Sequence, residues 1–151
     1  MSRSPSAELA VRLSQVRHVV FESLSEGSVG WTGTAGGTVQ VRASETQVVF
    51  EEAGTWTASA PGRPPVAFKN IFRWSIEPHR IGLEHLRFGP DHPVFLFHLI
   101  PESPHEWREE LPHACGGDRY RASLSWDDGG LRMIWQIAGP RKRETLAYRY
   151  W

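Results

Sequence analysis

Residues 118–126 have the sequence Asp-Arg-Tyr-Arg-Ala-Ser-Leu-Ser-Trp, in which polar and apolar side chains alternate strictly from Arg119 to Trp126. A period of two is typical of a β-strand with one wet and one covered face, because successive side chains point to opposite sides of a sheet. The same alternation continues almost without a break from residue 28 to the C-terminus. The sequence therefore predicts an antiparallel all-β domain.

Eight alternating segments are predicted as strands. They lie at residues 30–42, 47–56, 66–76, 81–88, 94–100, 119–126, 131–138 and 144–150. The turns between them are mostly short, which favours pairing between neighbours in the sequence. Eight strands in a meander close into a small barrel that can hold one ligand. We expect one barrel domain over residues 1–151, with residues 1–5 frayed.

Two short helices are also predicted. Residues Ala7–Val16 carry apolar side chains at helical spacing, and residues 18–24 follow as an extended lead-in to the barrel. Ser103, Pro104 and Glu106 have the pattern of a helix start, with a capping serine, proline at the first position and glutamate three residues after the cap. The second helix, from Pro104 to Leu111, is therefore expected to cross over between the fifth and sixth strands.

The composition excludes several classes of protein. Seventeen basic and seventeen acidic residues cancel, whereas a nucleic-acid protein usually carries a basic surplus. The longest apolar run, Pro93–Ile100, is far shorter than the 18–20 or so residues of a membrane-spanning helix. The one cysteine, Cys115, cannot form an internal disulfide, which fits a reducing compartment. We expect a cytoplasmic protein with neither nucleic-acid nor membrane partners.

Polar and aromatic side chains share the inward faces of several predicted strands. A core built only for stability has few polar groups, because each buried one must find a partner. Their presence predicts a ligand pocket inside the barrel. Its expected lining residues are Asn70, Phe72, Trp74, His85, Arg87, His98, Tyr120 and Trp135.

The position of His98 depends on the strand register. If residues 89–92 form a simple hairpin, residue 83 lies opposite residue 98, and His85 and His98 become diagonal neighbours roughly 7–8 Å apart. A slip of one residue would send them to opposite faces. No third ligand is evident near this pair, so we expect no metal site there.

A second group of chemically active residues precedes the sixth strand, in the pattern His113-x-Cys115-x2-Asp118-x-Tyr120. It lacks the paired ligands of a zinc site, so metal binding is not expected here either. Asp118 could cap the neighbouring glycine turn. Alternatively, Asp118 and Tyr120 lie at the barrel mouth and, with His98, move a proton in an enzymatic reaction.

Several motifs in the same order resemble a known family. They are Gly27–Trp31 with Gly33 and Gly36-Gly37, Glu51-Glu-Ala-Gly54, Phe68-x-Asn-x-Phe-Arg-Trp74, Phe97-His-Leu99, His113-x-Cys-x2-Asp-x-Tyr120 and Trp135-x-Ile-x-Gly-Pro-Arg-Lys142. Together they resemble an uncharacterised lipocalin-like (calycin-type) domain of unknown function found in bacteria and fungi. The resemblance implies an eight-stranded barrel closed at one end by the N-terminal segment, and it implies no activity. Nitrobindin-like relatives bind haem through a C-terminal histidine, whereas this chain has no histidine after His113, so no cofactor is expected.

Three functions are consistent with these observations. The first is binding of a small, largely apolar ligand with one or two polar groups inside the barrel. The alternative is a cofactor-independent isomerase, cyclase or lyase with His98, Asp118 and Tyr120 as its acid–base groups. The third is an interaction module with a filled interior. Homodimer formation is left open by the sequence.

Overall fold

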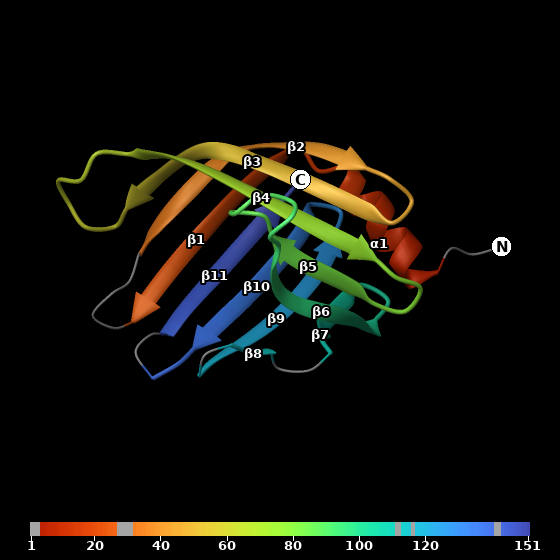
Figure 1. Cartoon of the computed structure of the whole chain (residues 1–151). Coiled ribbons are helices and arrows are strands. Elements are labelled where there is room, and N and C mark those ends of the chain that lie inside the picture. Colours follow the sequence, from red (N-terminus) through yellow and green to blue (C-terminus); the bar gives the residue numbers. More distant parts are fainter. Residues whose placement is uncertain (1–3, 27–31, 111–112, 116, 141–142) are drawn as a thin grey trace.

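Ten antiparallel strands of the described residues close into one barrel (Figure 1). The computed structural model describes residues 4–26, 32–110, 113–115, 117–140 and 143–151. The barrel closes because β10 pairs with both β11 and β9. Its strands are β1 (His18–Glu26), β2 (Gly33–Ala43), β3 (Gln47–Ala58), β4 (Val66–Ile76), β5 (Ile81–His85), β6 (Val94–Ser103), β7 (Glu106–Glu109), β9 (Asp118–Asp127), β10 (Gly130–Ala138) and β11 (Arg143–Tyr150). The short β8 (His113–Cys115) pairs with β9.

The all-β antiparallel barrel predicted from the sequence is confirmed, but the number of eight strands is wrong. One extra strand is β1, which was expected to be only an extended lead-in. Val19 and Phe21 are buried in it while their neighbours are exposed, and β1 pairs with both β2 and β11. The extended segment therefore completes the sheet. Part of the lead-in turn, with the Gly27–Trp31 motif, lies outside the described residues.

The other extra strand is β7, which replaces the predicted helix at residues 104–111. Pro104 and His105 form a tight turn, and the chain returns as a strand that pairs with β6 and β9. Trp107 is 1% exposed between two exposed neighbours, which is the period of a strand. A helix here would leave the facing edges of β6 and β9 unpaired, and β7 satisfies both.

The predicted N-terminal helix is present as α1 (Pro5–Ser14). The side chain of Ser4 caps it by accepting a hydrogen bond from the backbone N–H of Ala7. Leu9 and Leu13 are fully buried, and Figure 1 shows α1 lying across one end of the barrel. The helix therefore closes that end, next to the start of β3 and the end of β4. It is the one α-helix among the described residues, and it is too short to span a membrane.

The predicted bend at Gly36-Gly37 corresponds to a close approach between β2 and β3. Gly37 lies opposite Gly54 in the strand register. A Cβ atom on Gly37 would collide with the backbone carbonyl of Ala53, and one on Gly54 with that of Gly36. The pair of glycines lets the two backbones approach, as expected where a barrel strand bends.

The hydrophobic core is concentrated near α1. Phe50, Trp74, Leu83 and Leu124 are fully or almost fully buried there, together with the apolar face of the helix. At the opposite end, inward-facing side chains such as Trp56 and Phe68 are only partly buried. The barrel is therefore filled at the end closed by α1 and less filled at the other, which we call the open end.

Candidate functional site

A cavity of about 490 Å³ lies at the open end of the barrel. It is formed by the middle of β1, β10 and β11, the late part of β3, the early part of β4 and the end of β5. Its lining residues are Phe21, Ser23, Trp56, Val66, Ala67, Phe68, Asn70, Phe72, His85, Arg87, Trp135, Leu146 and Tyr148. Volumes of this size are typical of sites for small molecules.

The cavity walls are mainly aromatic. Phe21 packs edge-on against Phe68 with ring centroids 5.2 Å apart and stacks on Tyr148 at 5.0 Å. Phe72 meets Trp135 edge-on at 6.4 Å, and Trp135 lies 6.1 Å from Tyr148. These contacts hold the rings in place, so the walls present a preformed apolar surface.

His85 and Arg87 supply hydrogen-bond donors to one wall. The backbone N–H of Arg87 donates to Nδ1 of His85 at 2.9 Å. Burial, and then the positive charge of Arg87, lower the pKa of His85. The ring is therefore neutral at pH 7, and because Nδ1 accepts, its proton is on Nε2.

Arg87 and Asn70 are placed on that wall by the end of β5. His85 lies opposite Phe72 in the register, and the N–H of Leu86 donates to the carbonyl of Ile71 at 2.8 Å. The chain therefore still runs beside β4 after the strand ends, which brings Arg87 alongside Asn70. Both residues line the cavity.

A buried carboxyl lies beside Asn70 on the neighbouring strand. Glu52 is 0% exposed and sits opposite Asn70 in the β3–β4 register. Tyr150 donates a hydrogen bond from its hydroxyl to Oε2 of Glu52 at 2.7 Å. Oε1 has no hydrogen bond of ordinary geometry to the residues that the structure describes. The cavity therefore borders a carboxyl group, that of Glu52, which is buried among apolar side chains.

Burial raises the pKa of Glu52 to about 7. Desolvation of the carboxylate is the dominant cause, and interactions with the side chains of Tyr150 and Asn70 oppose it. Burial of Tyr148 and Tyr150 raises the pKa of both phenols, and the neighbouring Glu52 carboxyl raises it further. Both phenols therefore stay protonated. Glu52 is therefore the group near this cavity that can exchange a proton close to neutral pH.

Glu52 was not among the residues predicted from the sequence, although a signal was present. It follows Val48 and Phe50 in phase and precedes Gly54 and Trp56, all on the inward face of β3. A carboxylate in phase with an apolar face is unusual and points to a buried polar cluster. The alternation of β3 was sufficient to find it.

Most of the predicted pocket residues do meet at the cavity. The ones that line it are Asn70, Phe72, His85, Arg87 and Trp135. Trp74 faces inward but lies nearer α1, fully buried with its ring 5.8 Å from Phe50, so it belongs to the core. Tyr120 faces inward at the open end and packs against the core, but it is not among the described lining residues.

The expectation that His98 faces the interior is wrong. Its Nε2 lies 3.5 Å from Oε2 of Glu77, and its ring packs on Gly82, outside the barrel. His98 pairs with Gly82 rather than Leu83, because a bulge between Leu83 and Glu84 shifts the register by one residue. A shift of one residue exchanges the two faces of a strand. His85 and His98 therefore lie on opposite sides of the sheet.

Asp118 begins β9 at the open end of the barrel. A Cβ atom on Gly139 would collide with its carboxylate, so Asp118 packs directly on the backbone after β10. The predicted cap of the glycine turn at residues 116–117 is a different contact and stays a prediction. The side chains of His113 and Cys115 lie outside the described part, and among the described residues no three potential metal ligands gather.

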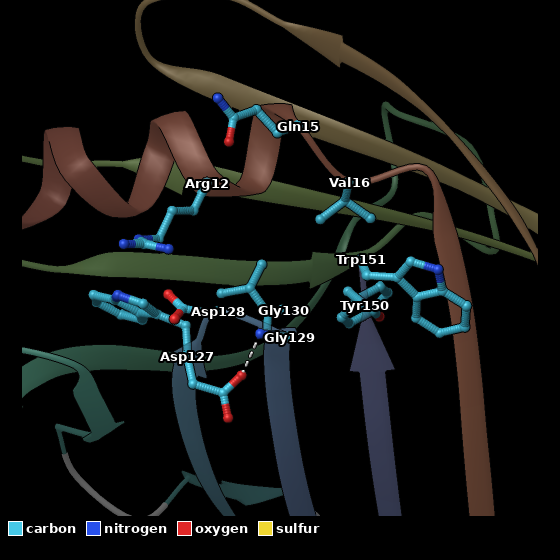
Figure 2. Close-up of a pocket in the computed structure, with 11 residues that line it drawn as sticks. Arg12, Gln15, Val16, Asp127, Asp128, Gly129, Gly130, Tyr150 and Trp151 are labelled. Carbon is cyan, nitrogen blue, oxygen red and sulfur yellow. Dashed lines mark hydrogen bonds between the residues drawn. The ribbon is translucent and has the colours of Figure 1, made fainter.

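A second, smaller cavity of about 280 Å³ lies at the closed end, between α1 and the β9–β10 turn (Figure 2). Arg12 extends from the helix over the ring of Trp126, 5.3 Å from its centroid. Asp127 accepts a hydrogen bond from the N–H of Gly129 at 2.7 Å, drawn as the dashed line in Figure 2. These contacts hold the β9–β10 turn beneath the helix. Arg12 and Asp127 therefore have a structural role at this cavity.

Fold and site together define a closed antiparallel barrel with a helix across one end and an aromatic cavity at the other. The chain belongs to DUF6314, a family of unknown function, whose profile matches residues 16–151. The matched region covers the barrel and begins just after α1. No curated protein and no solved structure matches the chain.

Proposed function

We propose that the barrel binds a small, largely apolar molecule carrying one or two polar groups, in the cavity at its open end. The observation that carries this proposal is the cavity of about 490 Å³ with aromatic walls and donors from His85, Arg87 and Asn70 on one side. A fold built for stability alone would cover this aromatic surface, because leaving apolar area in contact with water forgoes hydrophobic stabilisation. This combination of apolar walls with few polar groups is typical of ligand sites.

The proposal includes a lipocalin-like mode of binding, in which the ligand enters along the barrel axis. The helix across the far end supports this view, because among the described residues it closes that end alone. The polar wall and the aromatic wall then contact different parts of one ligand. The interaction-module alternative is less well supported, since its interior would be full.

Titration with N-phenyl-1-naphthylamine, a neutral apolar dye whose fluorescence rises in apolar surroundings, tests the proposal. We expect saturable binding of one dye per chain. Ser23→Phe should abolish it, because Ser23 lines the cavity and a benzyl group there occupies the ligand's space. Thr38→Phe, on the exposed face of β2, is the matched control and should bind dye as the parent does. Equal dye binding by both variants would contradict the proposal.

Acid–base catalysis in the same cavity is the second candidate function, and Glu52 is the observation that favours it. A carboxyl with a pKa of about 7 is suited to accept or donate a proton at neutral pH. This candidate puts Glu52 in place of His98, which lies outside the barrel. Glu52 has no exposed surface and does not line the cavity, so its proton would reach a ligand only after Asn70, its neighbour in the register, moves aside. Loss of turnover with retained dye binding in Glu52→Gln would identify a reaction, once a substrate is known.

A further inference from the structure

The charge of the cavity lining narrows the class of ligand. Arg87 lines the cavity and is exposed, and no ion pair joins its guanidinium to the described residues. The guanidinium lies over the exposed ring of Phe88, 5.7 Å from its centroid. On the same wall, by contrast, Arg73 of β4 is paired with Glu84 at 3.1 Å. An anionic ligand group in the cavity could therefore draw the charge of Arg87 away from the exposed ring of Phe88.

The other polar groups of this wall do not offset its positive charge. His85 is neutral and presents the donor Nε2–H, and Asn70 adds a neutral amide. No aspartate or glutamate is among the described lining residues. Glu52, beside Asn70, has no exposed surface and does not line the cavity, and its burial favours the uncharged form.

We propose, resting on the binding function above, that the ligand is an aromatic or other apolar carboxylate whose anionic group binds Arg87 and Nε2–H of His85. Its apolar body lies among the rings of Phe21, Phe72 and Trp135. A carboxylate suits the fork of donors on a guanidinium, and its second oxygen can accept from the imidazole. The charged end lies near water at the mouth, so binding requires little desolvation of charge.

Three competitors of one shape test this inference against the bound dye. They are 2-naphthoate, 2-naphthalenemethanol and 2-naphthylmethylamine, which carry an anionic, a neutral and a cationic group. We expect the carboxylate to bind about five- to tenfold more tightly than the alcohol, as for a partly exposed charge pair. The ammonium compound should bind most weakly. Raised salt should reduce the carboxylate's advantage.

Arg87→Gln separates charge recognition from packing. It should remove the carboxylate's advantage over the alcohol and leave the affinity for the alcohol unchanged. His85→Phe, which keeps the edge-on ring contact with Phe72, should reduce the same advantage in part. Arg149→Gln, an exposed arginine that does not line this cavity, is the control for overall charge and should change nothing.

The failure of this inference is distinguishable from failure of the proposed function. If the dye binds but the three competitors bind equally, or if Arg87→Gln weakens all three alike, the assignment of a carboxylate ligand is overturned while the binding function stands. If the dye itself does not bind in the cavity, the binding function fails.

Discussion

At the scale of single residues, Glu52 is the most unusual feature of the barrel. Its carboxyl has no exposed surface and is held by the hydroxyl of Tyr150, beside an aromatic stack in which Tyr148 and Tyr150 lie 5.6 Å apart. Burying a carboxyl in apolar surroundings costs free energy unless it is protonated or fully hydrogen-bonded. A group kept at this cost next to a cavity is a candidate for function.

The raised pKa of Glu52 predicts a specific pH dependence of stability. Between the ordinary pKa of 4.5 and about 7, the folded state holds this proton and the unfolded chain does not. The free energy of unfolding therefore falls as pH rises through this window, by about 3 kcal/mol, and this contribution is lost above pH 7. Glu52→Gln keeps an acceptor for Tyr150 and removes the titration.

Urea unfolding of both proteins from pH 4.5 to 8 measures this effect. Relative to the parent, the free energy of unfolding of Glu52→Gln should rise by about 3 kcal/mol between pH 4.5 and 8. The titrations of all other groups are shared by the two proteins and cancel in the difference. Thr55→Val, an exposed and non-titrating position on the outer face of the same strand, should show a pH dependence parallel to that of the parent. A constant difference between the Glu52 variant and the parent would mean that this carboxyl titrates normally.

At the scale of elements, the barrel depends on two local devices, the glycine pair of β2 and β3 and the short strand β7. The glycine pair predicts opposite results for adjacent substitutions. Gly37→Ala should destabilise the barrel by about 1–3 kcal/mol, because its Cβ meets the backbone of Ala53. Gly36→Ala meets only the side chain of Val20, at 3.6 Å, and should be neutral or slightly stabilising. Thermal unfolding of the two variants compares them, and equal effects would contradict the close approach.

Strand β7 closes the barrel between β6 and β9, and Trp107 anchors it. Trp107→Ala should cost about 3–5 kcal/mol, because a fully buried indole is replaced by a cavity. Arg108, its exposed neighbour, makes a half-exposed ion pair with Glu102 at 3.6 Å. Arg108→Ala should change stability by less than about 0.5 kcal/mol. Chemical denaturation checks both values, and a small effect at Trp107 would argue against its place in the barrel wall.

The differences between sequence and structure also arise at the scale of elements. Ser103, Pro104 and Glu106 fit a helix cap, but the same residue types fit a turn, and only the unpaired edges of β6 and β9 decide between them. The bulge after Leu83 likewise has no signature in the sequence, and it moved His98 to the outer face. Regular alternation, by contrast, correctly placed Asn70, Phe72 and Trp135 on the inward faces.

At the scale of the whole molecule, the two ends of the barrel differ in how completely side chains fill them. The helix and the large side chains of Trp74, Phe50 and Leu124 fill one end and supply stability. The other end is left hollow, with aromatic walls and a positively charged side. Under the proposed function, stability and binding belong to different halves of one interior, which allows the cavity to vary without loss of the fold.

The location of a bound apolar molecule tests the central claim most directly. Amide chemical shifts of the ¹⁵N-labelled protein, followed during titration with N-phenyl-1-naphthylamine, report that location. We expect the largest changes at residues of the open-end cavity, such as Ser23, Asn70 and Leu146, and no change at outward residues such as Thr38 or Ser123. Changes confined to the outer face of the barrel, or none at a saturating dye concentration, would contradict a binding site inside it.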